Sequence, residues 1–146
     1  MNNTQELNKI FESNKDKRIC VIGTSCIGKS TLLKELRNCY DMDDLLFPLL
    51  SKEETEYVCR QPWTNSIGSF MNKVTRERIK INVGNPVFGT VLIECDLIVL
   101  LTIDKELLES RCMSRNADFN SSWKMQNEII KEVKSSNIPY IEVKIK

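Results

Sequence analysis

The segment Arg-Ile-Cys-Val-Ile-Gly-Thr-Ser-Cys-Ile-Gly-Lys-Ser at residues 18–30 decides the fold predicted for this chain. It opens with an uninterrupted apolar run at residues 19–22 and reaches its first glycine at Gly23. A strand that is apolar on both faces is typical of the middle of a parallel sheet with both faces covered. Residues 29–38 favour a helix, because leucines recur along one side of it. The segment therefore predicts a buried strand, a glycine-rich turn and a helix.

The turn matches the pattern Gly-x-x-x-x-Gly-Lys-Ser/Thr in full, with the strand before it and the helix after it that this motif requires. Its glycines allow several backbone N–H groups to point at one anion, and the helix N-terminus adds its dipole. Lys29 supplies a mobile positive charge at the β- and γ-phosphates, and Ser30 can ligate Mg²⁺. The expected phosphate-binding residues are Gly23, Thr24, Ser25, Cys26, Ile27, Gly28, Lys29, Ser30 and Thr31. We predict that the chain binds a nucleotide through this loop. The alternative is a turn that only links strand to helix.

The rest of the chain alternates between strand and helix patterns. Further strands are expected at residues 39–40, 79–83, 97–102 and 140–145. Helices are expected after Thr4 as N-cap, near residues 51–60, along 67–74, after Asp104 and over 123–135. Ser51 and Glu54 match a capping box for the second of these helices, and residues 116–122 are expected to form a polar loop before the last one. This alternation predicts an α/β fold with a doubly wound parallel sheet of five strands and helices in three layers. We find no internal repeat or linker, so residues 1–146 are expected to form one domain, with an extra N-terminal helix within residues 1–17.

Composition excludes several kinds of chemistry. The chain has 146 residues and no histidine, which excludes Ser-His-Asp and Cys-His nucleophile systems and histidine-based zinc sites. With 21 basic and 20 acidic residues, the net charge of +1 provides no broad surface for extended nucleic acid or an anionic membrane. Proton transfer must therefore use a carboxylate, Lys, Tyr or Cys.

The six cysteines indicate a reducing compartment. None forms a Cys-x-x-Cys pair, and several lie in apolar runs, where a reduced cysteine behaves as a small hydrophobic residue. Residues 1–14 are polar and have no signal-peptide core, and the most apolar stretch, residues 87–103, is interrupted by Glu94 and Asp96. These features predict a cytoplasmic protein without a membrane span. The apolar side of the N-terminal helix is expected to dock either on the sheet or on a second copy of the chain.

Two classes of nucleotide-binding protein lack their signatures here. No Lys-x-Asp sequence occurs anywhere, so the guanine-reading motif of GTPases is missing. The two candidate strands at residues 79–83 and 97–102 do not end in the acidic residue that motor-type ATPases usually carry. Asp104 follows the second strand, but capping of the next helix is its better use.

The chain resembles the small P-loop kinases of the shikimate kinase, gluconate kinase and nucleoside monophosphate kinase group. The resemblance rests on the glycine-rich loop, on Asp-Met-Asp at residues 41–43, on the turn at Gly84 and on the run at residues 95–111. These features cover most of residues 18–115 in the family's order. The resemblance implies a sheet of order 2-3-1-4-5, ATP and Mg²⁺ as cofactors, phosphoryl transfer to a small acceptor, and a closing lid.

The resemblance also implies roles for individual acidic residues. In the shikimate-type pattern the first aspartate of Asp-x-Asp helps hold Mg²⁺, commonly through water, and the second faces the acceptor hydroxyl. Asp41 would then join Ser30 at the metal, and Asp43 would act on the acceptor. The alternative is that Asp41, Asp43 and Asp44 only cap the next helix and occupy a surface turn. Lys29, Asp43 and Arg111 are the expected catalytic residues.

The resemblance places lid arginines at the end of the helix after the fourth strand, where Arg111 and Arg115 lie four residues apart. An arginine there can neutralise charge on the transferring phosphoryl group. Asp43, Arg60 and Gly84 are the expected acceptor-binding residues. A solvated or paired surface role is the alternative for each arginine. Family members read adenine with a segment after the fifth strand, and here that surface is either missing or replaced by the N-terminal helix.

Three functions follow from this reading. The first is ATP- and Mg²⁺-dependent phosphoryl transfer to a nucleoside, a nucleotide or a hydroxylated metabolite, which needs positioning and charge neutralisation more than proton transfer. The second is a P-loop ATPase or nucleotide switch. The third is a module that binds nucleotide without catalysis. The expected partners are a nucleotide and a small-molecule acceptor, with a homo-oligomer also possible.

Overall fold

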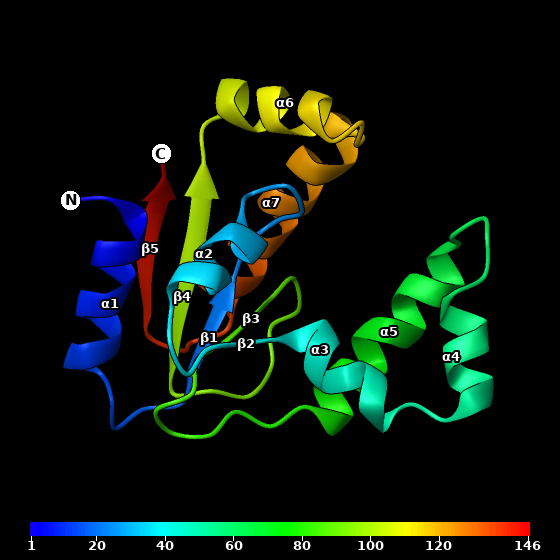
Figure 1. The fold of residues 1–146 in the computed structure, drawn as a ribbon, viewed down its shortest axis with the longest axis horizontal. Helices are drawn as coiled ribbons and strands as arrows, with labels where there is room; N and C mark the ends of the chain where they lie inside the picture. Colours follow the sequence, from blue (N-terminus) through cyan, green and yellow to red (C-terminus); the bar gives the residue numbers. More distant parts are fainter.

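Five parallel strands form one sheet in the computed structural model, which describes residues 1–146 (Figure 1). The strands are β1 (Ile19–Ile22), β2 (Tyr40–Asp41), β3 (Val87–Gly89), β4 (Leu97–Ile103) and β5 (Tyr140–Ile145). Their spatial order is β2-β3-β1-β4-β5, and every pairing is parallel. The predicted α/β class and the predicted order are therefore confirmed.

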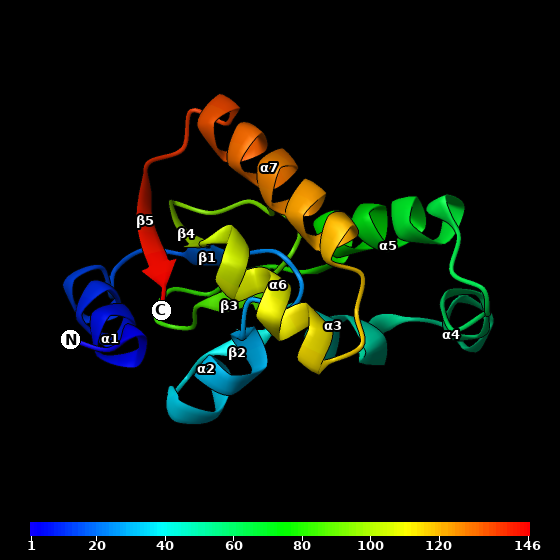
Figure 2. The same ribbon diagram turned by 90° about the horizontal axis from the view of Figure 1, so that it is seen from above.

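Helices cover both faces of the sheet (Figure 2). They are α1 (Asn3–Ser13), α2 (Lys29–Glu35), α3 (Met42–Leu46), the short 3₁₀ helix η1 (Phe47–Leu49), α4 (Lys52–Val58), α5 (Asn65–Arg78), α6 (Lys105–Ser114) and α7 (Phe119–Ser135). One hydrophobic core joins the sheet to α1, α2 and α6, and the other joins it to α3, α5 and α7. None of the helices is both long enough and apolar enough to span a membrane.

The central strand β1 explains why two cores form. All four of its residues are buried, and successive side chains point to opposite faces of a strand. Ile19 and Val21 belong to the core beneath α1, α2 and α6, whereas Cys20 and Ile22 belong to the core beneath α5 and α7. The continuous apolar run at residues 19–22 thus serves both layers.

The N-terminal helix α1 covers the outer strand β5. Leu7 of α1 is fully buried in the same core as Val143 and Ile145. The predicted apolar side of this helix therefore docks on the sheet of its own chain. Its N-cap is Asn2, whose side chain accepts from the Gln5 backbone, and the expectation that Thr4 caps this helix is wrong.

The third strand differs from the prediction. Residues 79–83 were expected to form it, yet β3 comes after the Gly84 turn, at Val87–Gly89. Ile79 and Ile81 are buried beneath α5 without pairing in the sheet. An extended segment can bury alternate apolar side chains without pairing with another strand. The alternating pattern therefore does not distinguish a strand of the sheet from an unpaired extended segment.

The connection between α6 and α7 is shorter than predicted. The polar stretch at residues 116–122 was expected to be a loop, but α7 already begins at Phe119, with Asp118 as its N-cap. Asp104 occupies the N-cap position of α6 as expected, but its side chain forms an ion pair with Lys144, at 2.7 Å, instead of capping the helix.

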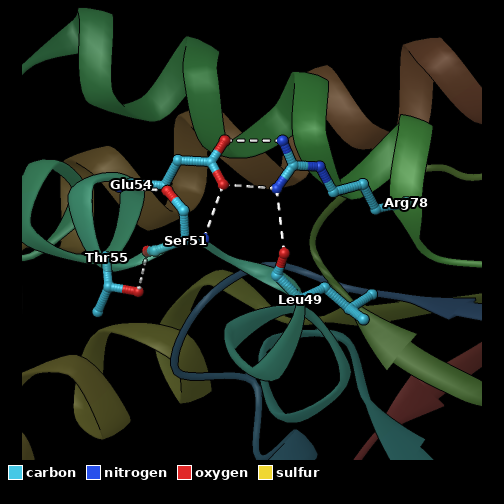
Figure 3. A network of polar contacts seen from close by, with 5 residues as sticks. All are labelled: Leu49, Ser51, Glu54, Thr55 and Arg78. Atoms are coloured by element: carbon cyan, nitrogen blue, oxygen red, sulfur yellow. Dashed lines mark hydrogen bonds and ion pairs between the residues drawn. The ribbon is translucent and has the colours of Figure 1, made fainter.

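A hydrogen-bonded ion pair holds α4 against α5 (Figure 3). The guanidinium of Arg78 donates to both carboxylate oxygens of Glu54, at 2.8 and 2.7 Å, and also to the Leu49 carbonyl oxygen. Glu54 and Ser51 form the capping box predicted from the sequence. The Arg78 hydrogen bonds and the Ser51 backbone N–H lower the pKa of Glu54 to about 2.

Replacing Gln126 of α7 should destabilise the fold. Its buried amide accepts from the Ile103 backbone N–H, at 3.1 Å, and donates to the Ile103 carbonyl oxygen, at 3.3 Å. Gln126→Leu leaves both backbone groups unpaired, so we expect a loss of about 1–3 kcal/mol in the free energy of unfolding, measured with urea. Asn127→Leu on the exposed face of α7 is the matched control. Equal stabilities of the two variants would contradict this role.

The Glu54–Arg78 pair should make stability depend on acid pH. Because the pKa of Glu54 is lowered in the folded state, its stabilising effect is present above the ordinary glutamate pKa and is lost as the pH falls towards 2. We expect the drop in melting temperature between pH 7 and pH 3 to be smaller in Glu54→Gln than in the wild type. Glu53→Gln, which removes an exposed neighbouring carboxylate, should behave as the wild type does. A drop in Glu54→Gln as large as that of the wild type would refute this.

Candidate functional site

The loop between β1 and α2 has the conformation that the glycine motif predicts. The Gly23 N–H donates to the Gly89 carbonyl oxygen, at 3.1 Å, which holds the start of the loop to β3. A Cβ atom at Gly23 would lie 3.0 Å from Leu101 Cβ, so a side chain there would require β4 to shift. Cys26 and Gly28 adopt left-handed conformations, with φ of 66° and 102°. These two residues curl the loop before α2 begins.

Lys29 folds back over the loop that precedes it. Its ammonium group donates to the Gly23 and Thr24 carbonyl oxygens, at 2.7 and 2.6 Å. Burial lowers the pKa of Lys29 to about 8, and the negative charges of Asp41 and Asp43 oppose this shift. The Lys29 ammonium therefore lies against the loop backbone. A phosphate bound by the loop would compete with the Gly23 and Thr24 carbonyl oxygens for its hydrogen bonds.

The structure brings the predicted acidic residues to the same place. Lys29, Asp41 and Asp43 line one small cavity of about 70 Å³, together with Gly89 and Thr90 at the carboxyl end of β3. Burial and the neighbouring charges of Asp41 and Asp44 raise the pKa of Asp43, and Lys29 opposes the shift. The Lys29 ammonium and the Asp43 carboxyl group, with its raised pKa, therefore lie together at the carboxyl ends of the strands. Ligands of parallel α/β sheets usually bind at this edge.

Asp41 also has the capping role that was the alternative for this cluster. Its side chain accepts from the Asp43 backbone N–H, at 2.8 Å, at the start of α3. Asp41 and Ser30 line one cavity of about 550 Å³ beside α2. Their oxygen atoms suit Mg²⁺, which is usually held by one or two protein groups plus phosphate and water. No group of three or more Cys, Asp or Glu side chains lies close enough together to hold a metal ion by itself.

The two arginines that were predicted to belong to a lid lie on the other side of the loop. Arg111 donates to the Ile27 carbonyl oxygen within the loop, at 2.7 Å, and more weakly to the Lys146 carbonyl oxygen, at 3.4 Å. Arg111 and Arg115 line a cavity of about 430 Å³ between α1, α2 and α6. The charge of Arg115 contributes to lowering the pKa of Lys29, whereas Arg111 contacts the loop through its hydrogen bond to Ile27. Whether Arg111 reaches the transferring phosphoryl group stays a prediction.

Arg60 and Gly84 are not brought to this site. Arg60 follows α4 and stacks over the Tyr57 ring, with 5.6 Å between the guanidinium carbon and the ring centroid, and it lines none of the three cavities around α2. Gly84 precedes β3 and therefore lies at the amino end of the strand, beside the last turn of α1. Because β3 begins after Gly84, the strand presents Gly89 and Thr90 to the site in its place.

Sequence reasoning missed the contact between the loop and α7. The Thr24 hydroxyl donates to the Ser122 carbonyl oxygen, at 2.6 Å, and the hydroxyls of Ser25 and Ser122 lie 2.7 Å apart. Thr24 and Ser122 are both buried. Nearly 100 residues separate them, so no local pattern reveals the pairing. The buried polar pair anchors the start of α7 to the loop.

Comparison with known proteins supports the fold. No family model and no curated protein sequence matches the chain. Among solved structures, the chain is similar to a deoxyadenosine kinase from M. mycoides with the products dCMP and a flexible dCDP bound. The two share 15% sequence identity, the match covers 86% of this chain and 88% of that one, and the TM-score is 0.51. At this identity the likeness shows a shared overall fold.

Nucleotide affinity should depend on pH through Lys29. With a pKa of about 8, Lys29 is an ammonium ion below pH 8 and becomes a neutral amine above it, and phosphate favours the ammonium form. We expect the affinity for ADP to fall by about tenfold per pH unit above the pKa, with proton uptake on binding. Isothermal titration calorimetry at pH 7–9.5 in buffers of different ionisation enthalpy measures both.

Lys29→Arg is the control for this pH dependence. Arginine keeps its charge over the whole range, so ADP binding by the variant should be nearly flat between pH 7 and 9.5. Binding by the wild type that is equally flat would show that Lys29 does not titrate in this range.

Proposed function

We propose that the protein transfers the γ-phosphoryl group of ATP, with Mg²⁺, to a hydroxyl group of a small acceptor, and that a nucleoside is the favoured acceptor. The proposal rests on one observation. Lys29, Asp41 and Asp43 all line the same cavity beside the glycine-rich loop. A loop for phosphates next to a carboxylate of raised pKa matches the needs of phosphoryl transfer, which depends mainly on positioning and charge neutralisation.

Each residue has a defined task in the proposed reaction. The backbone of the loop and Lys29 hold the β- and γ-phosphates, which gives the developing charge a fixed set of donors. The acceptor oxygen forms a bond to the γ-phosphorus while the bond from that phosphorus to the β–γ bridging oxygen breaks, and ADP leaves. Asp43 accepts the acceptor's hydroxyl proton and later releases it to water. A carboxylate of raised pKa is a better base for this step than an ordinary one.

Ser30 and Asp41 are the residues that would hold Mg²⁺, Asp41 through a water molecule. When bound, the ion supplies charge neutralisation at the phosphate oxygens. Both residues line the cavity of about 550 Å³ beside α2, which places oxygen donors next to the phosphate loop.

The same cavity suits the acceptor. It lies between α2, β2 and α3 and contains Asp43, and its volume falls within the usual range for small-molecule sites. A nucleoside is favoured over other acceptors because the solved structure of similar fold is described as a deoxyadenosine kinase with dCMP and dCDP bound. Nucleoside monophosphates and hydroxylated metabolites are the remaining classes to be compared with it.

An ADP-release screen over nucleosides, nucleoside monophosphates and hydroxylated metabolites tests this function. We expect ADP release to require an acceptor, and Lys29→Ala to abolish it. Asp43→Asn should lower kcat by about 10²- to 10⁴-fold with little change in the KM for ATP, because the variant loses the base and keeps the loop.

Asp16→Asn is the matched control, since Asp16 is an exposed aspartate that lines none of the three cavities around α2. Its kcat should remain within about threefold of the wild type, as for most surface changes. ADP release that needs no acceptor and survives Asp43→Asn would replace this function with ATP hydrolysis.

A further inference from the structure

Two cavities flank α2, and their charges differ. The cavity on the β2 side contains Asp41, Asp43 and Asp44, with Lys34 as its one basic residue. The cavity on the α6 side contains Arg111, Arg115 and Lys146, with Glu35 as its one acidic residue. A bound nucleoside phosphate must direct its sugar and base to one of these sides. Because its phosphates are anionic, the basic side is electrostatically favoured.

The basic cavity adjoins the phosphate loop directly. Ile27 and Gly28 of the loop and Thr31 of α2 line it, so a chain of phosphates held by the loop can continue into it. Apolar side chains of Ile27, Leu32 and Ile145 also line it. Its volume of about 430 Å³ is within the range of small-molecule sites. The cavity therefore offers apolar contact for a flat ring together with charge at the phosphate end.

The first turn of α1 closes the far end of this cavity, where the two termini of the chain lie side by side (Figure 1). Asn3 donates to the Lys144 carbonyl oxygen and accepts from the Lys146 N–H, both at 2.9 Å, which fastens α1 to the end of β5. The Thr4 hydroxyl donates to Glu35 on α2. Three elements that are distant in the sequence thus hold one rigid wall.

This wall presents one unused acceptor and one unused donor. Thr4 bonds to one carboxylate oxygen of Glu35, and the other oxygen has no donor from the protein. The side-chain oxygen of Asn2 accepts from the Gln5 N–H, and its NH₂ group has no acceptor from the protein. Both residues line the cavity. An acceptor and a donor in the same cavity are complementary to adenine, whose amino group donates and whose N1 accepts.

We propose that the first turn of α1 and Glu35 read the adenine base of the nucleotide donor, with Glu35 accepting from the adenine amino group and Asn2 donating to N1. Thr4 is a positioning residue that orients Glu35. The proposal rests on the nucleotide binding of the proposed function but not on catalysis. In this proposal α1, which precedes the first strand of the sheet, determines which base the protein binds.

Binding of ADP and of purine riboside 5′-diphosphate, which lacks the amino group, tests this without any acceptor. We expect the wild type to bind the analogue about tenfold more weakly than ADP, the effect of one hydrogen bond to a charged group. Glu35→Ala should weaken ADP binding by about the same factor and leave analogue binding within about twofold. The two losses should not add, because they remove the same interaction.

Control variants separate base reading from stability. Glu12→Ala, at the other end of α1, should bind both ligands as the wild type does. Asn2→Asp keeps a good N-cap but removes the amide donor, so ADP binding should weaken while the melting temperature stays unchanged. Thr4→Val should reduce the preference for ADP over the analogue, and Thr4→Ser should restore it.

The outcomes distinguish this proposal from the proposed function. If Glu35→Ala binds ADP and the analogue as the wild type does, or if GDP binds more tightly than ADP, the base assignment is wrong even when the protein is an active kinase. If the wild type prefers ADP through Glu35 but no acceptor supports turnover, base reading stands and the kinase function fails. Absence of any nucleotide binding would overturn both.

Discussion

The hydrogen bond from the Gly23 N–H to the Gly89 carbonyl oxygen, at 3.1 Å, fixes the geometry on which the rest of the site depends. It extends the pairing of β1 with β3 by one step beyond the last strand residues, Ile22 and Gly89. On the other side, Leu101 of β4 packs so closely that a side chain at position 23 would require a local shift. The glycine-rich loop therefore begins at a point held by both neighbouring strands, and the start of α2 is fixed with it.

The two sides of α2 carry opposite charges. Three aspartates lie on the β2 side, two arginines lie on the α6 side, and Lys29 lies at the loop between them. Burial alone would favour the neutral form of Lys29, and the nearby carboxylates partly restore its ammonium form. In the proposed complex, the anionic phosphates pair with the lysine and the arginines and offset their positive charge.

Local patterns predicted the parts of the structure that depend on neighbouring residues in the chain. The apolar run at residues 19–22, the glycine motif after it and the capping box of Ser51 and Glu54 all formed as expected. Residues 79–83 did not form the expected strand. Their alternating apolar pattern indicates which side chains are buried, but not whether the segment pairs with another strand. The same error misplaced Gly84, since the strand that reaches the site begins only at Val87. Contacts such as Thr24 with Ser122 and Thr4 with Glu35 join residues from separate elements, so no local pattern encodes them.

The fold class, the glycine-rich loop and the acidic residues after the second strand could all be predicted from the amino-acid sequence alone. Each of these follows from residue types at short spacings, where backbone geometry limits the alternatives. Only the tertiary structure decided which side of α2 is acidic and which is basic, and that α1 closes the basic side. Those features arise from packing between α1, α2, α6 and β5, whose relative positions are set by burial of Leu7, Leu108 and Val143 in one shared core. Nonspecific apolar contacts of that kind are compatible with many arrangements until the whole chain is packed.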